Sequence, residues 1–433
     1  MKRIISLLLV LIIALAPMML LTSCSDSKEV KTLYVYNWGQ YISDGSEDSY
    51  DTNAEFEAYW NENLADEYGY EIRVSYSTYA SNEDMYNKIV SGSAKYDIII
   101  PSDYMIDRLV REDLLYAFNP AETVENYQYI DEEFKGLFYD KENLYSVPYA
   151  YGVVGVIYNA DRVDTEAEGF GTWDLMWNEQ YKGKILQFNN SRDAFGTSLY
   201  RLGYDVNTTN KAEWDEALSE LAKQKPLVQS YVMDEIFNKM GTSSAWISAY
   251  YAGDYFTMYD DNDSLDFYYP EEGTNIYIDA MCIPKNSENK DAAIEYINFM
   301  LSEETAIANA EYTCYATPNR LVYENEEYIE YINDCYDGEM FESGYDILYC
   351  KTKDISEKSD DDEEGTVYVS YYHAIENTEE NGYLLSYTNE LWETLKIESS
   401  GALWVYITAA AIVLLLIGWA VYAYAVKRYR DRY

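Results

Sequence analysis

The 433-residue chain has one histidine, eight prolines, five cysteines and few basic residues. With His373 alone it has no histidine cluster for a transition-metal site, and any Ser–His catalytic pair would depend on that side chain. A formal net charge of −46, from 31 basic and 77 acidic residues, argues against a nucleic-acid-binding protein, which needs a basic face. We therefore expect no metal site, no cofactor and no nucleic-acid partner.

Aromatic residues are abundant, with 50 tyrosines and nine tryptophans. Hydrophobic residues make up 48% of the chain and aromatics 16%, which argues against a disordered protein. The length and apolar content suit a globular body of two domains or lobes, each with its own core.

The N-terminal end has the pattern of a secretory signal. Lys2 and Arg3 precede an apolar run over residues 4–16, and the sequence LTSC follows at residues 21–24. This resembles a bacterial lipobox, so residues 1–23 are predicted to be a lipoprotein signal peptide and Cys24 the lipidated residue. The alternative is an uncleaved membrane anchor with an incidental cysteine.

The C-terminal end is predicted to contain a second membrane element. Residues 402–426 carry no charge. As a helix they would span about 37 Å, enough to cross the hydrocarbon core of a bilayer. The basic tail 427–433 follows directly and is predicted to be cytoplasmic, which places the acidic body on the outer face of the cell membrane. A buried core helix is the alternative for residues 402–426.

The body between these ends alternates strand and helix patterns, which predicts an α/β fold with parallel strands covered by helices. The predicted strands are 33–36, 71–77, 96–101, 152–159, 184–189 and 274–284, and the predicted helices include 53–64, 105–115, 211–224, 233–240 and 290–301. The acidic stretch 354–365 is predicted to be a solvated loop, with a calcium site as a minor alternative. Cys282, Cys314, Cys335 and Cys350 are either paired or free, and three pairings are possible.

Ligands of open parallel sheets bind beyond the carboxyl ends of the strands. That rule selects residues 37–41, 102–104 and 190–193, and the segments 245–248 and 277–279 also place a ring beside a polar residue. The recurring combination is an aromatic ring with a carboxylate or hydroxyl. Carboxylates hold ammonium groups, and ring faces hold methylene stems and cations. The combination therefore favours an organic cation with an apolar stem.

Several segments resemble the bacterial spermidine/putrescine-binding lipoproteins. The most specific are YNWGQY (36–41), YDIIIPSDYMID (96–107), IYIDAMCIPKNSENKDAAIEYINFML (276–301) and YATPN (315–319). The resemblance runs from about residue 32 to residue 319. It implies the two-lobed, type II periplasmic-binding-protein-like fold of polyamine ABC importers, with lobe 1 formed by 31–149 plus 279–318 and lobe 2 by 150–278 plus 319–396.

The resemblance also implies which residues line the cleft between the lobes. Carried over position by position, they are Trp38, Tyr41, Ser102, Tyr104, Asp193, Trp246, Tyr277, Asp279 and Tyr315. Asp279 and Asp193 would contact ligand amines, and Trp246 would stack on the stem. The chain departs from the family at Asn190, where the spermidine type can have an acid, and Asp103 is a candidate to replace the missing charge.

These observations predict a membrane-anchored substrate-binding protein, not an enzyme, that captures putrescine or spermidine and delivers it to the permease and ATPase subunits of an ABC importer. Two alternatives stay open on the sequence. One is a sensor or receptor for polyamine-like cations with the same fold. The other is a surface hydrolase that uses paired carboxylates.

Overall fold

The computed structural model describes residues 28–359, 361–399 and 418. The predicted signal peptide, Cys24, the predicted membrane span 402–426 and the basic tail 427–433 lie outside these residues, apart from Gly418 alone. Within the part that is described, no helix is both long and apolar enough to cross a membrane.

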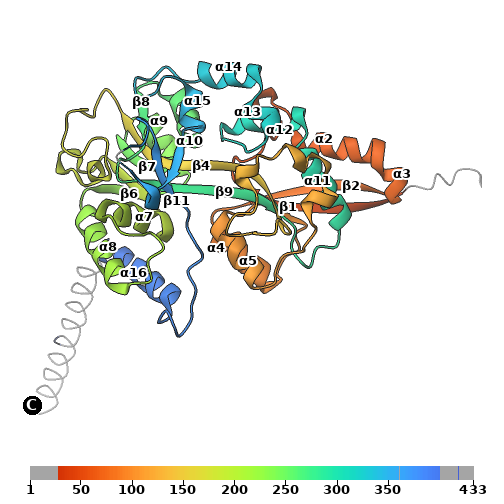
Figure 1. The fold of residues 1–433 in the computed structure, drawn as a ribbon, viewed down its shortest axis with the longest axis horizontal. Coiled ribbons are helices and arrows are strands. Elements are labelled where there is room, and N and C mark those ends of the chain that lie inside the picture. The colour runs from red at the N-terminus through yellow and green to blue at the C-terminus, as the bar shows by residue number, and fades with distance from the viewer. Residues whose placement is uncertain (1–27, 360, 400–417, 419–433) are drawn as a thin grey trace, which may run out of the picture.

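The molecule is elongated, and two long strands run along it from one half to the other (Figure 1). The strands are β1 (Glu29–Trp38), β2 (Tyr70–Tyr79), β3 (Ile98–Ile99), β4 (Ser146–Asn159), β5 (Ile185–Phe188), β6 (Val228–Val232), β7 (Ile247–Tyr251), β8 (Leu265–Tyr268), β9 (Thr274–Cys282), β10 (Thr352–Asp354) and β11 (Val367–Ser370). Their order is β2-β1-β3-β9-β4-β7-β5-β6, with β8 beside β4, β11 beside β9 and β10 beside β11. The long strands β4 and β9 therefore join the two halves of the molecule.

The predicted parallel arrangement is confirmed within each half. Strands β1, β2 and β3 are mutually parallel, and so are β5, β6 and β7. Strand β4 is antiparallel to β7, β8 and β9, and β9 is antiparallel to β3 and β4 but parallel to β11, so the sheet as a whole is mixed. Whether a buried strand pairs parallel or antiparallel with its neighbour depends on the long-range path of the chain, and the local hydrophobic pattern carries no information about it.

Helices cover the sheet on both halves. They are α2 (Thr52–Tyr59), α3 (Ala65–Tyr68), α4 (Asn82–Ser91), α5 (Asp103–Arg111), α6 (Pro120–Thr123), α7 (Ser191–Leu202), α8 (Lys211–Gln224), α9 (Glu235–Gly241), α10 (Ala252–Asp261), α11 (Lys290–Met300), α12 (Glu303–Thr313), α13 (Arg320–Tyr323), α14 (Glu326–Asp334), α15 (Gly344–Leu348) and α16 (Leu384–Ser399). Short 3₁₀ turns and one π turn, Trp60–Leu64, join them. Helices α16 and α8 lie side by side at one end of the molecule (Figure 1).

Helix α4 begins and ends at the residues that the sequence marks as helix caps, Ser81 and Gly92. The Ser81 side chain accepts a hydrogen bond from the amide of Asp84, and Gly92 ends the helix in a left-handed conformation with φ of 60°. A hydroxyl at the start satisfies an orphan amide, and only glycine adopts the left-handed region at little cost. The four cysteines of the body are free thiols.

Two main apolar cores support the two halves. One contains Leu33, Ile98 and Ile297, around β1–β3 and α11. The other contains Ile157, Leu186 and Ile247, around β4–β8 and the helices that follow them. The strands that end between these two cores position the candidate site.

Candidate ligand-binding site

A cavity of about 390 Å³ lies where strands from the two halves end. Trp38 closes β1, Ser102 follows β3, Asn190 follows β5, and Tyr251 closes β7, while Tyr277 projects from β9. The volume falls in the range of small-molecule sites. The carboxyl ends of parallel strands in both halves therefore meet at this cavity, in agreement with the rule that ligands bind there.

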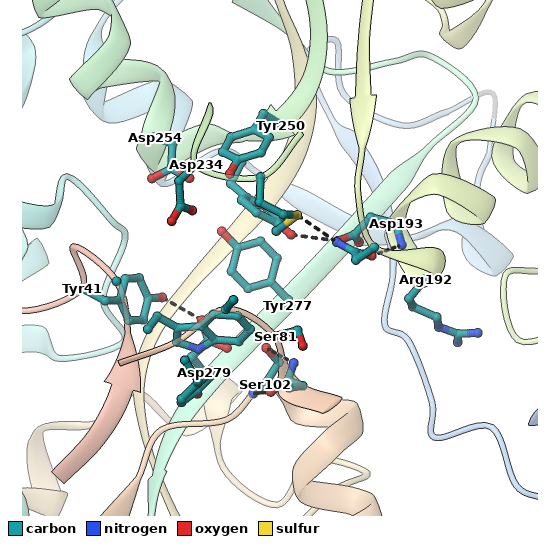
Figure 2. A pocket seen from close by; sticks show the side chains of 18 of the residues that line it. Tyr41, Ser81, Ser102, Arg192, Asp193, Asp234, Tyr250, Asp254, Tyr277 and Asp279 are labelled. Atoms are coloured by element: carbon teal, nitrogen blue, oxygen red, sulfur yellow. Dashed lines mark hydrogen bonds between the residues drawn. The ribbon is translucent and has the colours of Figure 1, made fainter. Parts of the chain in front are cut away.

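The lining is aromatic and acidic. Five carboxylates face the cavity, namely Glu83, Asp193, Asp234, Asp254 and Asp279. Ten aromatic rings line it, namely Trp38, Tyr41, Tyr79, Tyr104, Phe237, Tyr250, Tyr251, Tyr277, Tyr315 and Tyr372. Arg192 is the one basic residue among the described lining residues. Figure 2 shows Asp279, Asp193 and the Asp254–Asp234 pair on different sides of Tyr277.

Asp279 has an unused hydrogen-bond acceptor. It is 4% exposed, and its Oδ2 accepts a hydrogen bond of 2.8 Å from the Tyr41 hydroxyl. Its Oδ1 has no hydrogen-bond partner among the described residues. Burial raises the pKa of Asp279 to about 6, although interactions with the Ser102 and Tyr41 hydroxyls oppose this shift. A buried carboxylate with a free oxygen is a strong acceptor for an ammonium group.

Asp193 is held in place by its neighbours. The Tyr251 hydroxyl and Asn190 Nδ2 each donate to its Oδ2 at 2.7 Å. Asn190 also caps α7, because its Oδ1 accepts the amide N–H of Asp193 at 2.8 Å. Burial raises the pKa of Asp193, and these two hydrogen bonds oppose the rise. Asn190 thus lines the cavity as the residue that orients Asp193.

Asp254 and Asp234 form a third acidic region. Asp254 is in the first turn of α10, directly after β7, and Asp234 precedes α9, directly after β6. Burial raises the pKa of Asp254 to about 7, opposed by a hydrogen bond with Tyr315, and the nearby charge of Asp234 adds to the rise. A cation bound here would favour the ionised form of Asp254.

The rings are packed closely enough to make a shaped wall. Tyr251 and Tyr277 meet edge to face with centroids 5.2 Å apart, and Tyr41 and Tyr315 do so at 4.9 Å. The Tyr277 hydroxyl and Trp38 Nε1 are buried polar atoms with no hydrogen-bond partner in the described part of the chain. Such faces suit a methylene stem, and the two polar atoms are available to a ligand.

The structure brings together most of the residues predicted from sequence. Trp38, Tyr41, Ser102, Tyr104, Asp193, Tyr277, Asp279, Tyr315 and Asn190 all line the cavity. They come from five separate segments of the chain, from residue 38 to residue 315. Their convergence agrees with the sequence-based site, and their roles toward a ligand remain predictions.

Two predicted residues do not reach the cavity. Trp246 immediately precedes β7 and so lies at its amino end, where its Nε1 donates to the Ser243 carbonyl at 3.2 Å and its ring lies under Lys184 Nζ. Asp103 is 1% exposed and turns into the fold, where its carboxylate accepts from the amides of Tyr104 at 2.6 Å and Ile278 at 3.4 Å. Placing Trp246 and Asp103 in the cleft was therefore wrong.

Other lining residues were missed. Asp254 and Tyr251 lie at the carboxyl end of β7, a strand that was not among those predicted, so recognising it would have selected them. Asp234 was missed because the strand β6 before it was not recognised. Tyr372 lies beyond the segment with family resemblance, and no signal in the sequence marks it.

An α/β fold with one aromatic, carboxylate-rich cavity at its strand ends is that of a periplasmic-binding-protein-like solute receptor. Residues 54–333 match the family described as bacterial extracellular solute-binding protein. The chain is 31% identical over 298 residues to the spermidine/putrescine-binding periplasmic protein of Escherichia coli, covering 69% of this chain and 80% of that protein. It is 26% identical over 314 residues to the putrescine/cadaverine-binding protein of Pseudomonas aeruginosa, covering 69% and 83%.

A solved structure shows the same likeness. The spermidine/putrescine ABC transporter substrate-binding protein PotD of Streptococcus pneumoniae is 30% identical and superposes with a TM-score of 0.62, covering 86% of this chain and 100% of that one. The chain belongs to the bacterial extracellular solute-binding protein family. It is accordingly a binding protein and not an enzyme.

Proposed function

We propose that this protein captures a polyamine, putrescine or spermidine, in the cavity and delivers it to the permease and ATPase subunits of an ABC importer. The observation that carries the proposal is the lining: five carboxylates and ten rings against a single arginine. The names of the relatives from E. coli, P. aeruginosa and S. pneumoniae support it.

The chemistry of the cavity matches the parts of such a ligand. One ammonium group would bind Asp279, whose Oδ1 lacks a partner among the described residues, and another would bind Asp193 or Asp254. Charge-assisted hydrogen bonds of this kind are about twice as strong as neutral ones. The methylene stem would lie against Tyr277 and Tyr251, and each ammonium group placed over a ring would add roughly 0.5–2 kcal/mol.

We propose that two lobes close on the ligand, with residues 31–149 and 279–318 in one and residues 150–278 and 319–396 in the other. The two separate cores and the crossing strands β4 and β9 support this division. Helix α12 lies near the junction, since Ala306 and Ala310 pack against the second core. Closure would present a surface to the permease.

We further propose that the body is held at the outer face of the cell membrane. A lipid on Cys24 would anchor one end, and a transmembrane helix over residues 402–426 would anchor the other, with residues 427–433 in the cytoplasm. The support is the sequence pattern of these two ends.

The function is tested by isothermal titration calorimetry of the full chain with putrescine, spermidine and spermine. Butylamine, which has the same stem as putrescine but one ammonium group, is the matched control ligand. We expect a dissociation constant below about 100 µM for at least one polyamine and much weaker binding of butylamine. If all three polyamines bind no better than butylamine, the proposal is wrong.

A further inference from the structure

Residues 371–373, which follow β11, pass between the two halves of the molecule, and their side chains point alternately to opposite sides. The rings of Tyr371 and His373 face Phe138, with centroids 5.7 Å and 4.4 Å away. The ring of Tyr372 faces the other way and lines the ligand cavity. An extended segment points successive side chains to opposite sides, so one short strip contacts Phe138 and the cavity at once.

Two side chains grip the backbone of this strip. Arg192 Nη2 donates to Asn207 Oδ1 at 2.8 Å and to the His373 carbonyl at 3.1 Å. Asn207 Oδ1 accepts the amide N–H of His373 at 2.8 Å, and Asn207 Nδ2 donates to the Tyr371 carbonyl at 2.8 Å. Arg192 and Asn207 together therefore bind three backbone groups on the two sides of Tyr372. We call this pair the clamp.

Arg192 of the clamp lies beside the candidate cation site. The Arg192 guanidinium stacks on the Tyr372 ring at 4.5 Å and binds the strip through Nη2. In Figure 2 it points away from Asp193 and from Tyr277. Its Nη2 donors are thus used by Asn207 and the strip, while its positive charge still acts on Asp193 and opposes the rise in the pKa of that carboxyl group.

The position of Tyr372 leaves little freedom. A Cβ built on Gly196 of α7 would lie only 2.0 Å from the Tyr372 hydroxyl oxygen, so the ring end packs directly against the helix backbone. A small movement of the strip would therefore change the shape of the cavity wall next to Asp193, which lies one turn earlier on the same helix.

We propose that Arg192 and Asn207 are positioning residues for ligand capture, which hold residues 371–373 so that Tyr372 forms one wall of the cavity. The inference depends on the proposed function for the identity of its ligand. Because the strip lies between Phe138 and α7 and carries Tyr372, its position would influence the affinity for the ligand.

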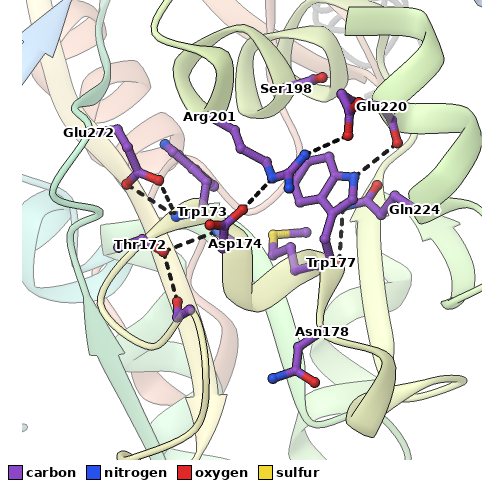
Figure 3. A network of polar contacts seen from close by, with 12 residues as sticks. Thr172, Trp173, Asp174, Trp177, Asn178, Ser198, Arg201, Glu220, Gln224 and Glu272 are labelled. Carbon is purple, nitrogen blue, oxygen red and sulfur yellow. Dashed lines mark hydrogen bonds and ion pairs between the residues drawn. The ribbon is translucent and has the colours of Figure 1, made fainter.

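The test uses the full chain in detergent with two pairs of matched variants. Asn207→Ala is compared with Asn178→Ala, because Asn178 also bonds two backbone groups, the Gln180 amide and the Glu168 carbonyl. Arg192→Lys is compared with Arg201→Lys, because Arg201 lies on the same helix and stacks on Trp177 at 4.6 Å. Figure 3 shows Arg201 bonded to Asp174 and Glu220, with Asn178 nearby, and neither Asn178 nor Arg201 lines the cavity.

Spermidine affinity is the first measurement. Asn207→Ala and Arg192→Lys are each expected to raise the dissociation constant about tenfold, since each loses hydrogen bonds that together are worth about that factor. Both controls should stay within about twofold of the parent chain, as for substitutions remote from a site. Affinities within twofold of the parent for Asn207→Ala and Arg192→Lys would overturn the proposal.

A double-mutant cycle then asks whether the clamp acts through Tyr372. In a Tyr372→Ala background, Asn207→Ala should weaken binding by less than about threefold, because the wall it positions is already missing. A full tenfold loss in that background would contradict a positioning role for the clamp.

Amide hydrogen exchange of residues 371–376 without ligand separates this inference from the proposed function. Asn207→Ala should speed exchange there about tenfold or more, and Asn178→Ala should not, because only the first opens the strip. Unchanged exchange overturns the clamp whatever the ligand. If the parent chain binds no polyamine while exchange behaves as expected, the proposed function fails and the clamp stands.

Discussion

Replacing Asp279 by asparagine is expected to weaken polyamine binding strongly and to remove part of the pH dependence of stability. The carboxylate is almost fully buried, and Oδ1 has no hydrogen-bond partner among the described residues. A hydrogen bond to a charged group contributes about 1.5–3 kcal/mol. The dissociation constant for putrescine or spermidine should therefore rise roughly 10- to 150-fold.

The stability effect follows from the raised pKa. Burial moves the pKa of Asp279 from its ordinary value of 3.8 to about 6. The folded protein then takes up a proton between pH 6 and pH 4 that the unfolded chain does not bind. The ligand-free parent chain should gain about 1 kcal/mol from this group as the pH falls from 7.5 to 5. The Asp279→Asn variant lacks that gain.

Calorimetry at pH 7.5 measures the affinity, and urea unfolding at pH 7.5 and pH 5 measures the difference in free energy of unfolding. Asp140→Asn is the control, because Asp140 is buried outside the cavity and accepts from the amides of Leu144, Tyr145 and Ser146. It should lose stability at both pH values and bind polyamine normally. Asp279→Asn with an affinity within threefold of the parent, or with the parent's pH dependence, would refute the reasoning.

Three further changes test other parts of the site. Trp246→Ala should lower the free energy of unfolding by about 1–3 kcal/mol but leave the dissociation constant within twofold of the parent. A tenfold weaker affinity would show that the Trp246 ring contributes to ligand binding. Gly253→Ala should weaken binding about tenfold, because the new Cβ would lie 2.6 Å from the Tyr315 ring and displace that ring. A normal affinity in calorimetry would contradict this close packing. Affinity for spermidine should fall at least tenfold from pH 8 to pH 5, because Asp254, with a pKa of about 7, and Asp279 become protonated. Calorimetry in two buffers of different ionisation enthalpy should then show that protons are released when spermidine binds. A flat pH profile would mean that neither carboxylate holds the ligand.

Much of the fold was predictable because it depends on local patterns. The apolar runs at 33–36 and 96–101 lie in β1 and at β3, and the helical spacing over 211–224 matches α8. The antiparallel crossings β4 and β9 were not predictable in this way, since a buried strand has the same pattern in either direction.

The candidate site was predictable where a residue directly follows a strand whose bounds the sequence marks. Trp38 and Ser102 were found by that rule, and Asp279 by the pattern of a ring beside a polar residue together with the family resemblance. Trp246 was misplaced because it stands at the amino end of β7, and the same strand delivers Asp254 from its other end.

The amino-acid sequence by itself determined the composition of the site: many rings, an excess of carboxylates and few cations, which together favour an organic cation as ligand. Only the tertiary structure decided which of the acids face a common cavity. Asp103 turns into the sheet to meet Ile278, whereas Tyr372 arrives from the far end of the chain to complete the wall. The physical reason is that a side chain's direction depends on the strand it pairs with and on the segment packed over it. Both of these are set by contacts between residues far apart in the sequence.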